Sequence, residues 1–233
     1  MSRLAFSFLA LLLLTMPTPF AWSQKEGEGK KIVLFNSKNL EGWKVEGIAK
    51  YPDPKDNTKK LPIWSVKEGK LFCKGYRYGF LRYAKQQFGD FHFHVEYRML
   101  GGKRNNSGIG IRTVPFDPRR SGQTRPSRAS YEIQLLDDAG EKPNNHSTGS
   151  LYRYVAPKVN KVKPAPEWNT MDIICVGPRI RVKMNGESII DFDQSKHPRL
   201  QKNPLKGYLC VQNHGSPIEF RNLWVRDIQT DTK

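Results

Sequence analysis

Side chains that can exchange protons stand at alternate positions of short apolar segments in this 233-residue chain. Segment 131–135 carries Glu132 and Gln134 between apolar residues, and segment 207–214 ends in His214. The unperturbed pKa of histidine, about 6.5, suits His214 as a general base, and Glu132 is the second candidate acid or base. This combination predicts acid–base chemistry on a bound substrate.

Hydrogen-bond donors and acceptors that suit the same chemistry occur in neighbouring segments. Arg112 and Gln134 are expected to donate to a developing oxyanion, an interaction whose loss typically costs about 2.7–4 kcal/mol of activation free energy. We expect a second set of polar residues to bind substrate hydroxyl groups: Glu96, Gln134, Gln212, Asn106 and Asp137. For Asn106, a turn that merely enters a strand is the alternative.

Apolar and polar residues alternate along most of the chain, the period of half-buried β-strands. Residues 91–99 place five apolar side chains on one face, with His92 and His94 on the other. Between two further segments, Asn185-Gly186 predicts a tight hairpin turn. Beyond the N-terminal region no stretch carries the apolar period of a helix. The same alternation recurs at 107–114, 131–135, 180–184, 187–192, 207–214 and 218–225.

These strands predict an all-β fold, a jelly-roll sandwich of two curved antiparallel sheets. One concave sheet is expected to present its polar face as a groove. The long loops 50–62, 115–130 and 141–167 are expected to wall that groove. Without repeats or a domain-sized linker, residues 24–233 are predicted to form one domain.

The N-terminal residues 1–23 have the order of a secretory signal peptide. Arg3 precedes the uncharged run Leu4–Leu14, and small residues at 21 and 23 suit a cleavage site before Gln24. The run is shorter than the roughly 20 apolar residues that span a bilayer. The sequence therefore predicts an exported protein, periplasmic or extracellular, that is not an integral membrane protein.

A surplus of basic residues gives the chain a formal net charge of +17. Such a charge attracts polyanions, but the basic residues are spread along the whole chain and no nucleic-acid-binding motif accompanies them. The densest cluster, Arg119, Arg120, Arg125 and Arg128, lies in a loop and is interpreted as surface charge. No nucleic-acid partner is predicted, and the oligomeric state is not readable from the residues.

The three cysteines, Cys73, Cys175 and Cys210, lie in apolar strand-like segments without metal-binding or redox spacing. They are predicted to be buried free thiols, with one Cys175–Cys210 bridge as the alternative. His92 and His94 have a spacing that can bind metal but lack an evident third ligand. No cofactor is predicted, and a divalent metal is left open.

Several segments together resemble the 3-keto-disaccharide hydrolase family of secreted bacterial proteins. They run in family order over nearly the whole chain after the signal peptide. The matching segments are 34–36, 40–43, 64–69, 90–91, 96–98, 106–108, 111–112, 131–137, 148–152, 167–170, 209–215 and 219–223.

The resemblance implies a concanavalin-A-like lectin/glucanase sandwich and a carbohydrate substrate, a glycoside whose sugar carries a ketone at C3. Such a ketone acidifies the proton on C2, so a base can remove it and the resulting enolate can expel the substituent on C1. Water then adds to the double bond. In this hypothesis Glu132 and His214 are the acid–base pair and Arg112 supports the enolate.

Two other functions stay open. Glu132-x-Gln134-x-x-Asp137 is similar to the Glu-x-Asp-x-x-Glu signature of laminarinase-like glucanases, in which two carboxylates about 5–5.5 Å apart cleave ordinary glycosides. Asp137 reaches the face of Glu132 only through a bulge, because residues five apart on a regular strand point to opposite faces. The second alternative is a non-catalytic carbohydrate-binding module of the same fold.

Overall fold

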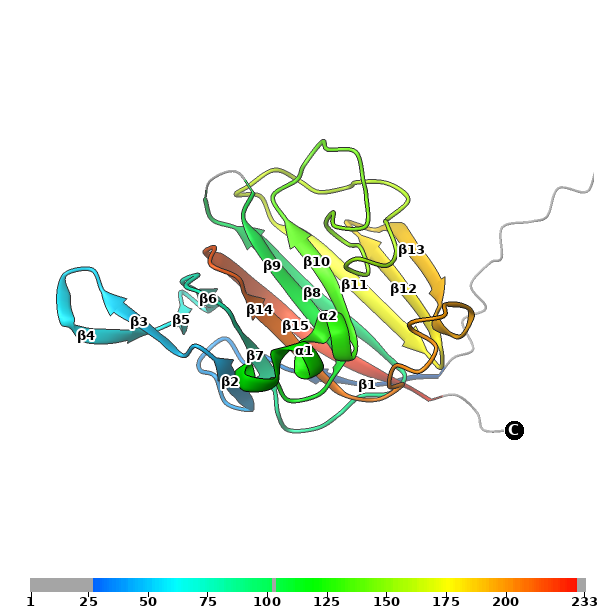
Figure 1. The fold of residues 1–233 in the computed structure, drawn as a ribbon, viewed down its shortest axis with the longest axis horizontal. Coiled ribbons are helices and arrows are strands. Elements are labelled where there is room, and N and C mark those ends of the chain that lie inside the picture. Colours follow the sequence, from blue (N-terminus) through cyan, green and yellow to red (C-terminus); the bar gives the residue numbers. More distant parts are fainter. Residues whose placement is uncertain (1–26, 102–103, 230–233) are drawn as a thin grey trace, which may run out of the picture.

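The computed structural model describes residues 27–101 and 104–229, and the predicted signal peptide lies outside them. Two antiparallel sheets pack against each other (Figure 1). The larger sheet has β1 (Gly27–Val33) beside β15 and the strand order β13 (Glu187–Asp193), β12 (Arg179–Met184), β11 (Asn169–Val176), β8 (Phe91–Met99), β15 (Ile218–Gln229), β6 (Lys70–Cys73), β5 (Trp64–Lys67).

The second sheet of the sandwich carries most of the residues singled out for chemistry. Its five strands are in the order β10 (Tyr131–Leu136), β9 (Asn106–Thr113), β14 (Tyr208–Asn213), β7 (Gly79–Tyr83), β2 (Trp43–Gly47). Strands far apart in the sequence are neighbours in both sheets, as in a jelly roll. The predicted all-β sandwich is confirmed.

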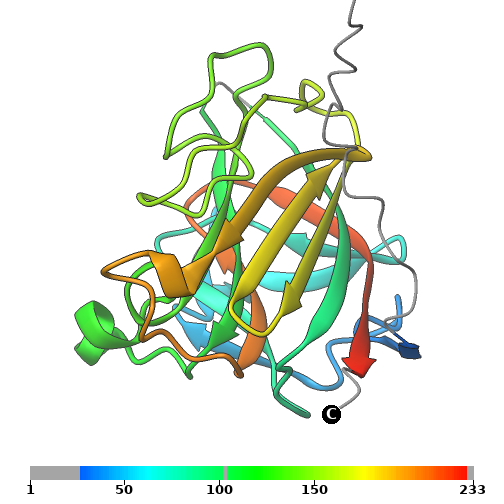
Figure 2. The same cartoon turned by 90° about the vertical axis from the view of Figure 1, so that its right-hand side faces the viewer.

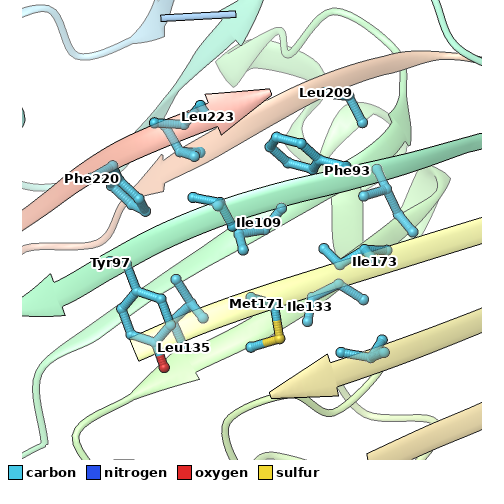
Figure 3. Close-up of a cluster of buried hydrophobic side chains, with 14 of the residues drawn as sticks. Phe93, Tyr97, Ile109, Ile133, Leu135, Met171, Ile173, Leu209, Phe220 and Leu223 are labelled. Carbon is cyan, nitrogen blue, oxygen red and sulfur yellow. The ribbon is translucent and has the colours of Figure 1, made fainter. Parts of the chain in front are cut away.

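The apolar core lies between the two sheets. Along β8 every second side chain is buried, as the period-two pattern predicts. Figure 3 shows Phe93 and Tyr97 of β8 among residues of β9, β10, β11, β14 and β15. Burying each large apolar side chain stabilises the fold by about 1.5–3 kcal/mol. The core therefore holds both sheets rigidly enough to position side chains on their outer faces.

The connections differ in part from the prediction. Residues 50–62 do not wall the groove, because β3 (Lys50–Asp53) and β4 (Asp56–Pro62) form a separate hairpin that projects from the sandwich (Figure 1). The loop 115–130 contains three short helical turns, and a fourth follows β13. They are η1 (Pro118–Arg120), α1 (Ser121–Thr124), α2 (Pro126–Ala129) and η2 (Gln194–Lys196).

Two local predictions are confirmed. Asn185 and Gly186 turn the chain between β12 and β13 with φ angles of 49° and 84°, the left-handed values that a tight hairpin requires. All three cysteines are buried free thiols, so the alternative of a Cys175–Cys210 bridge is wrong. Across residues 27–101 and 104–229 there is no helix with the length and apolarity needed to cross a membrane.

Candidate functional site

The register of the smaller sheet brings three predicted residues to one outer face. Glu132 pairs with Gly110 and Gln134 with Gly108 across β10 and β9. Their neighbours along β10 point into the apolar core. On β14, Gln212 faces outward by the same alternation, and the following residue in that alternation is His214. The period of the strands thus suffices to gather these side chains on one surface.

Gly108 of β9 has no side chain, so side chains of β10 and β14 meet above its backbone. A Cβ atom at Gly108 would lie 3.2 Å from Glu132 Oε1 and 3.5 Å from Gln212 Oε1. Across this gap Gln212 Nε2 donates to Glu132 Oε1 at 2.8 Å. Glu132 and Gln212 are only 5% and 1% exposed, respectively. The pair therefore forms the polar floor of a cavity.

Loops close this cavity, which has a volume of about 40 Å³. Arg125 packs over the Tyr78 ring at 4.7 Å, and the His214 ring meets the same tyrosine edge-on at 5.3 Å. The predicted contributions of loops 115–130 and 141–167 are therefore confirmed. The complete lining is Tyr78, Asn106, Arg125, Ser127, Glu132, Gln134, Tyr152, Arg153, Gln212 and His214.

A buried ion pair fastens the loop that carries Arg125. Glu46 Oε1 accepts from Arg82 Nε at 2.7 Å, and each side chain is 6% exposed. Glu46 Oε2 accepts from the backbone N–H of Phe116 at 2.8 Å, where the loop leaves β9. The Arg82 guanidinium lies 4.2 Å above the ring of Tyr208. The charged Glu46 side chain of the sheet thus holds the start of the loop that forms part of the cavity wall.

Two titratable groups of the cavity, Glu132 and His214, have pKa values shifted toward each other. Burial raises the pKa of the Glu132 carboxyl, although hydrogen bonds from Gln212 and Ser127 and the charge of Arg125 oppose this shift. Although His214 is an exposed residue, partial desolvation of its imidazole, together with the positive charge of Arg125, lowers its pKa. A carboxyl with a raised pKa and an imidazole with a lowered pKa that line one cavity can act as a general acid and a general base.

Three polar atoms of the lining are buried without a hydrogen-bond partner in the described part of the chain: Asn106 Oδ1, Arg125 Nε and Gln212 Oε1. A buried polar group without a partner is costly, by about 1–3 kcal/mol. Such atoms gathered around one cavity are free to bond water or the polar groups of a ligand.

Arg112 lies outside this cavity, so its predicted position is wrong. Tyr208 and Cys210 of β14 pair with Thr113 and Gly110 of β9. One residue of β14 but two residues of β9 lie between these pairs, and one of the two, Arg112, has a left-handed φ of 52°. This β-bulge breaks the alternation. The Arg112 side chain is 0% exposed, and its Nη2 donates to the carbonyl of Gly89 at 2.9 Å. Arg112 therefore has a structural position.

Glu96 and Asp137 also lie elsewhere, which corrects their predicted place beside the substrate. Glu96 belongs to β8 of the other sheet, where its Oε2 accepts from Arg221 Nε at 2.6 Å. Asp137 follows the end of β10 and lines a separate crevice with Tyr97 and Lys163. Without a bulge in β10, it does not reach the face of Glu132.

Several lining residues were not predicted from the sequence. Arg125 was interpreted as surface charge, and Tyr78, Ser127 and Arg153 carried no signal of their own. Tyr152 fell within a segment of the family resemblance. Loop residues reach a site through three-dimensional packing, which period-two patterns do not describe.

His92 and His94, whose spacing can bind metal, share a carboxylate partner instead of a metal-ligand set. His92 Nε2 and His94 Nδ1 each lie 2.8 Å from the same oxygen, Asp172 Oδ1, on the outer face of the larger sheet. In residues 27–101 and 104–229, no group of three or more His, Cys, Asp or Glu side chains is arranged to hold a metal ion.

Known proteins share both sequence and fold with this chain. A family described as the 3-keto-alpha-glucoside-1,2-lyase-like domain matches residues 30–226. A 3-keto-disaccharide hydrolase of Bacteroides thetaiotaomicron is 23% identical over 235 residues, which cover 84% of this chain and 77% of the relative. The family match supports a carbohydrate-active function.

The similar solved structures include two inferred glycosyl hydrolases from Parabacteroides distasonis ATCC 8503. One is 21% identical with a TM-score of 0.68, and the match covers 85% of this chain and 94% of the solved chain. The other is 26% identical with a TM-score of 0.66, and the match covers 85% of this chain and 100% of the solved chain. The VIP36 exoplasmic/lumenal domain shares the fold, with 11% identity and a TM-score of 0.56. The match covers 87% of this chain and 90% of the VIP36 chain.

Proposed function

Because the chain belongs to the 3-keto-alpha-glucoside-1,2-lyase-like domain family, we propose that it cleaves glycosides whose sugar carries a ketone at C3. The observation that carries the proposal is the presence of Glu132 and His214 in one cavity, with pKa values raised and lowered respectively. A ketone at C3 makes the C2 proton acidic, so one base and one acid suffice to expel the C1 substituent.

In the first step neutral His214 takes the proton from C2, and the C–H electron pair forms the enolate double bond between C2 and C3. Negative charge then develops on the C3 oxygen. Arg125 supplies the cation that was expected from Arg112, because it lines the cavity and its buried Nε has no partner among the described residues. A donor aimed at a developing oxyanion lowers the barrier to its formation.

In the second step the enolate collapses. The C3 carbonyl re-forms, a double bond forms between C1 and C2, and the bond from C1 to the leaving oxygen breaks. That oxygen takes the proton from Glu132, whose raised pKa suits a general acid. Water then adds across the double bond: its hydroxyl joins C1, Glu132 accepts its proton, and His214 returns a proton to C2.

The glucanase alternative lacks its second carboxylate. Among the described residues, Glu132 is the one carboxylate that lines the cavity, and Asp137 lies in another crevice. Double displacement with two carboxylates about 5–5.5 Å apart is therefore not supported here. The proposal also includes export, for which residues 1–23 are the supporting sequence feature.

The test compares a methyl glucoside with its chemically prepared 3-keto analogue in heavy water. We expect consumption of the keto form alone, with exchange of deuterium at C2. His214→Ala and Glu132→Gln should each lower turnover at least about a hundredfold, the usual scale for general acid–base groups. Glu68→Gln is the matched control, because its side chain is 84% exposed in the turn between β5 and β6.

Three outcomes oppose the proposal. Cleavage of both glucosides would indicate an ordinary glycosidase. Binding of either sugar without turnover would favour the carbohydrate-binding module. Wild-type rates in both His214→Ala and Glu132→Gln would show that the reaction, if present, uses another site.

A further inference from the structure

A second and larger hollow adjoins the cavity of Glu132. It has a volume of about 350 Å³ and is lined by Arg128, Arg153, Tyr154, His197 and Arg199, which we call the arginine basin. Arg153 lines both hollows. A ligand whose reactive part occupies the small cavity therefore has room for its next group in the basin.

Three segments far apart in the sequence build the basin. Arg128 belongs to α2, Arg153 follows β10 in the long loop before β11, and Arg199 follows η2. In Figure 2 the green helical turns, the green loop above them and the orange segment after β13 lie on the same side of the molecule. The shape of the basin thus depends on the fold as a whole, unlike a run of basic residues along one strand.

The guanidinium groups of the basin differ from those of several other arginines in the described part of the chain. Arg82, Arg98, Arg179 and Arg221 each bond a carboxylate at 2.6–2.7 Å. Within residues 27–101 and 104–229, no carboxylate forms an ion pair with any of the three basin arginines. None of the described residues that line the basin is acidic.

All three arginines are exposed residues, and the positive charge of Arg153 also acts on Glu132. An anion in the basin is attracted by all three charges, most strongly at low salt. Arginine is also suited to oxyanions, because its planar group donates two parallel hydrogen bonds to a carboxylate or sulfate. The charge and the chemistry of the lining therefore favour the same kind of ligand.

The backbone at Arg153 is held in a conformation that side chains disfavour. Its φ is 76°, in the left-handed region that favours glycine. Two bonds to Asn145 maintain it: the Arg153 N–H donates to the Asn145 carbonyl at 2.8 Å, and Asn145 Nδ2 donates to the Arg153 carbonyl at 3.0 Å. The fold thus fixes the backbone of the arginine that lines both hollows.

We infer that the arginine basin binds an oxyanion, a carboxylate or a sulfo group, on the leaving group of the substrate. This inference rests on the proposed function, since it assigns the small cavity to the keto sugar. The preferred substrates are then 3-keto glycosides of acidic partners. The surrounding positive charge also steers such substrates to the site, an effect that salt weakens.

The test uses three 3-keto glucosides with 4-carboxyphenyl, 4-sulfophenyl or 4-carbamoylphenyl leaving groups. We expect kcat/KM for at least one anionic compound to exceed that of the uncharged amide by about tenfold or more at low salt, as one additional charged hydrogen bond allows. The ratio should fall as salt is added. The two anionic compounds separate carboxylate from sulfonate recognition.

Variants connect this preference to the basin. In Arg128→Gln/Arg199→Gln the ratio of anionic to amide kcat/KM should fall toward one. Arg120→Gln is the control, because this exposed arginine lies in the same loop as Arg128 but bonds Gln123 outside the basin. A wild-type ratio near one, or a ratio that the double variant leaves unchanged, would overturn the inference.

A binding measurement separates this inference from the proposed function. The same three leaving groups on ordinary glucosides, which the proposal leaves uncleaved, are titrated into the protein by calorimetry. Tighter binding of the anionic forms, lost in the double variant, supports the basin even if no 3-keto compound is cleaved. Equal binding of all three, with turnover of every 3-keto compound, supports the function and overturns the basin.

Discussion

Replacing Glu46 by alanine should destabilise the protein strongly and disturb the cavity wall. The substitution leaves the Arg82 guanidinium buried without its partner, since each side chain of the pair is 6% exposed. It also removes the acceptor for the Phe116 N–H. Loss of one member of a buried ion pair typically costs about 3–5 kcal/mol. With a urea m-value of about 2 kcal/mol/M, the unfolding midpoint should fall by about 1.5–2.5 M.

The double variant Glu46→Leu/Arg82→Met isolates the cause. It removes both charges and leaves chiefly the Phe116 N–H unsatisfied, for which the expected loss is about 1–3 kcal/mol. Urea unfolding followed by tryptophan fluorescence measures all three proteins. If Glu46→Ala loses less than about 1 kcal/mol, or if the double variant is as unstable as the single one, the unpaired charge is not the main cause of the destabilisation and the reasoning fails.

Two further predictions concern Glu132 and the N-terminus. Burial raises the pKa of the Glu132 carboxyl, so its contribution to stability is present below the unfolded pKa of about 4.3 and is lost as the pH rises through the folded pKa. Glu132→Gln should therefore unfold at higher urea than wild type at pH 7 and equally at pH 3.5; a less stable variant at pH 7 would contradict this. Mass spectrometry of the protein secreted from a bacterial host should show a chain beginning near Gln24, whereas an intact Met1 would refute cleavage.

Much of the sandwich is readable from the sequence because its strands are half buried. Alternation identified β8, and the Asn185-Gly186 turn identified the hairpin of β12 and β13. The same alternation correctly placed Glu132, Gln134 and Gln212 on one face. These predictions succeed because one face of each strand must avoid water, a constraint that acts residue by residue.

The wrong site predictions concern residues whose positions depend on the packing of distant segments and not on the burial pattern of their own strand. Arg112 was expected to donate to the oxyanion of the substrate, but the bulge that turns its side chain inward has no side-chain signature. Glu96 lies on the polar face of its strand as expected, yet periodicity does not reveal which of two sheets contains that strand. Arg125 enters the cavity from a helical loop whose path depends on anchors such as Glu46.

The β3–β4 hairpin is a suitable place to attach a label or a surface to the protein. Its turn, between Asp53 and Asp56, is exposed, and its strands pair with each other outside both main sheets. None of its residues lines either of the two hollows. A single cysteine introduced at Lys55 would therefore carry a fluorophore or tether the enzyme to a support, while sugars still reach both hollows unhindered.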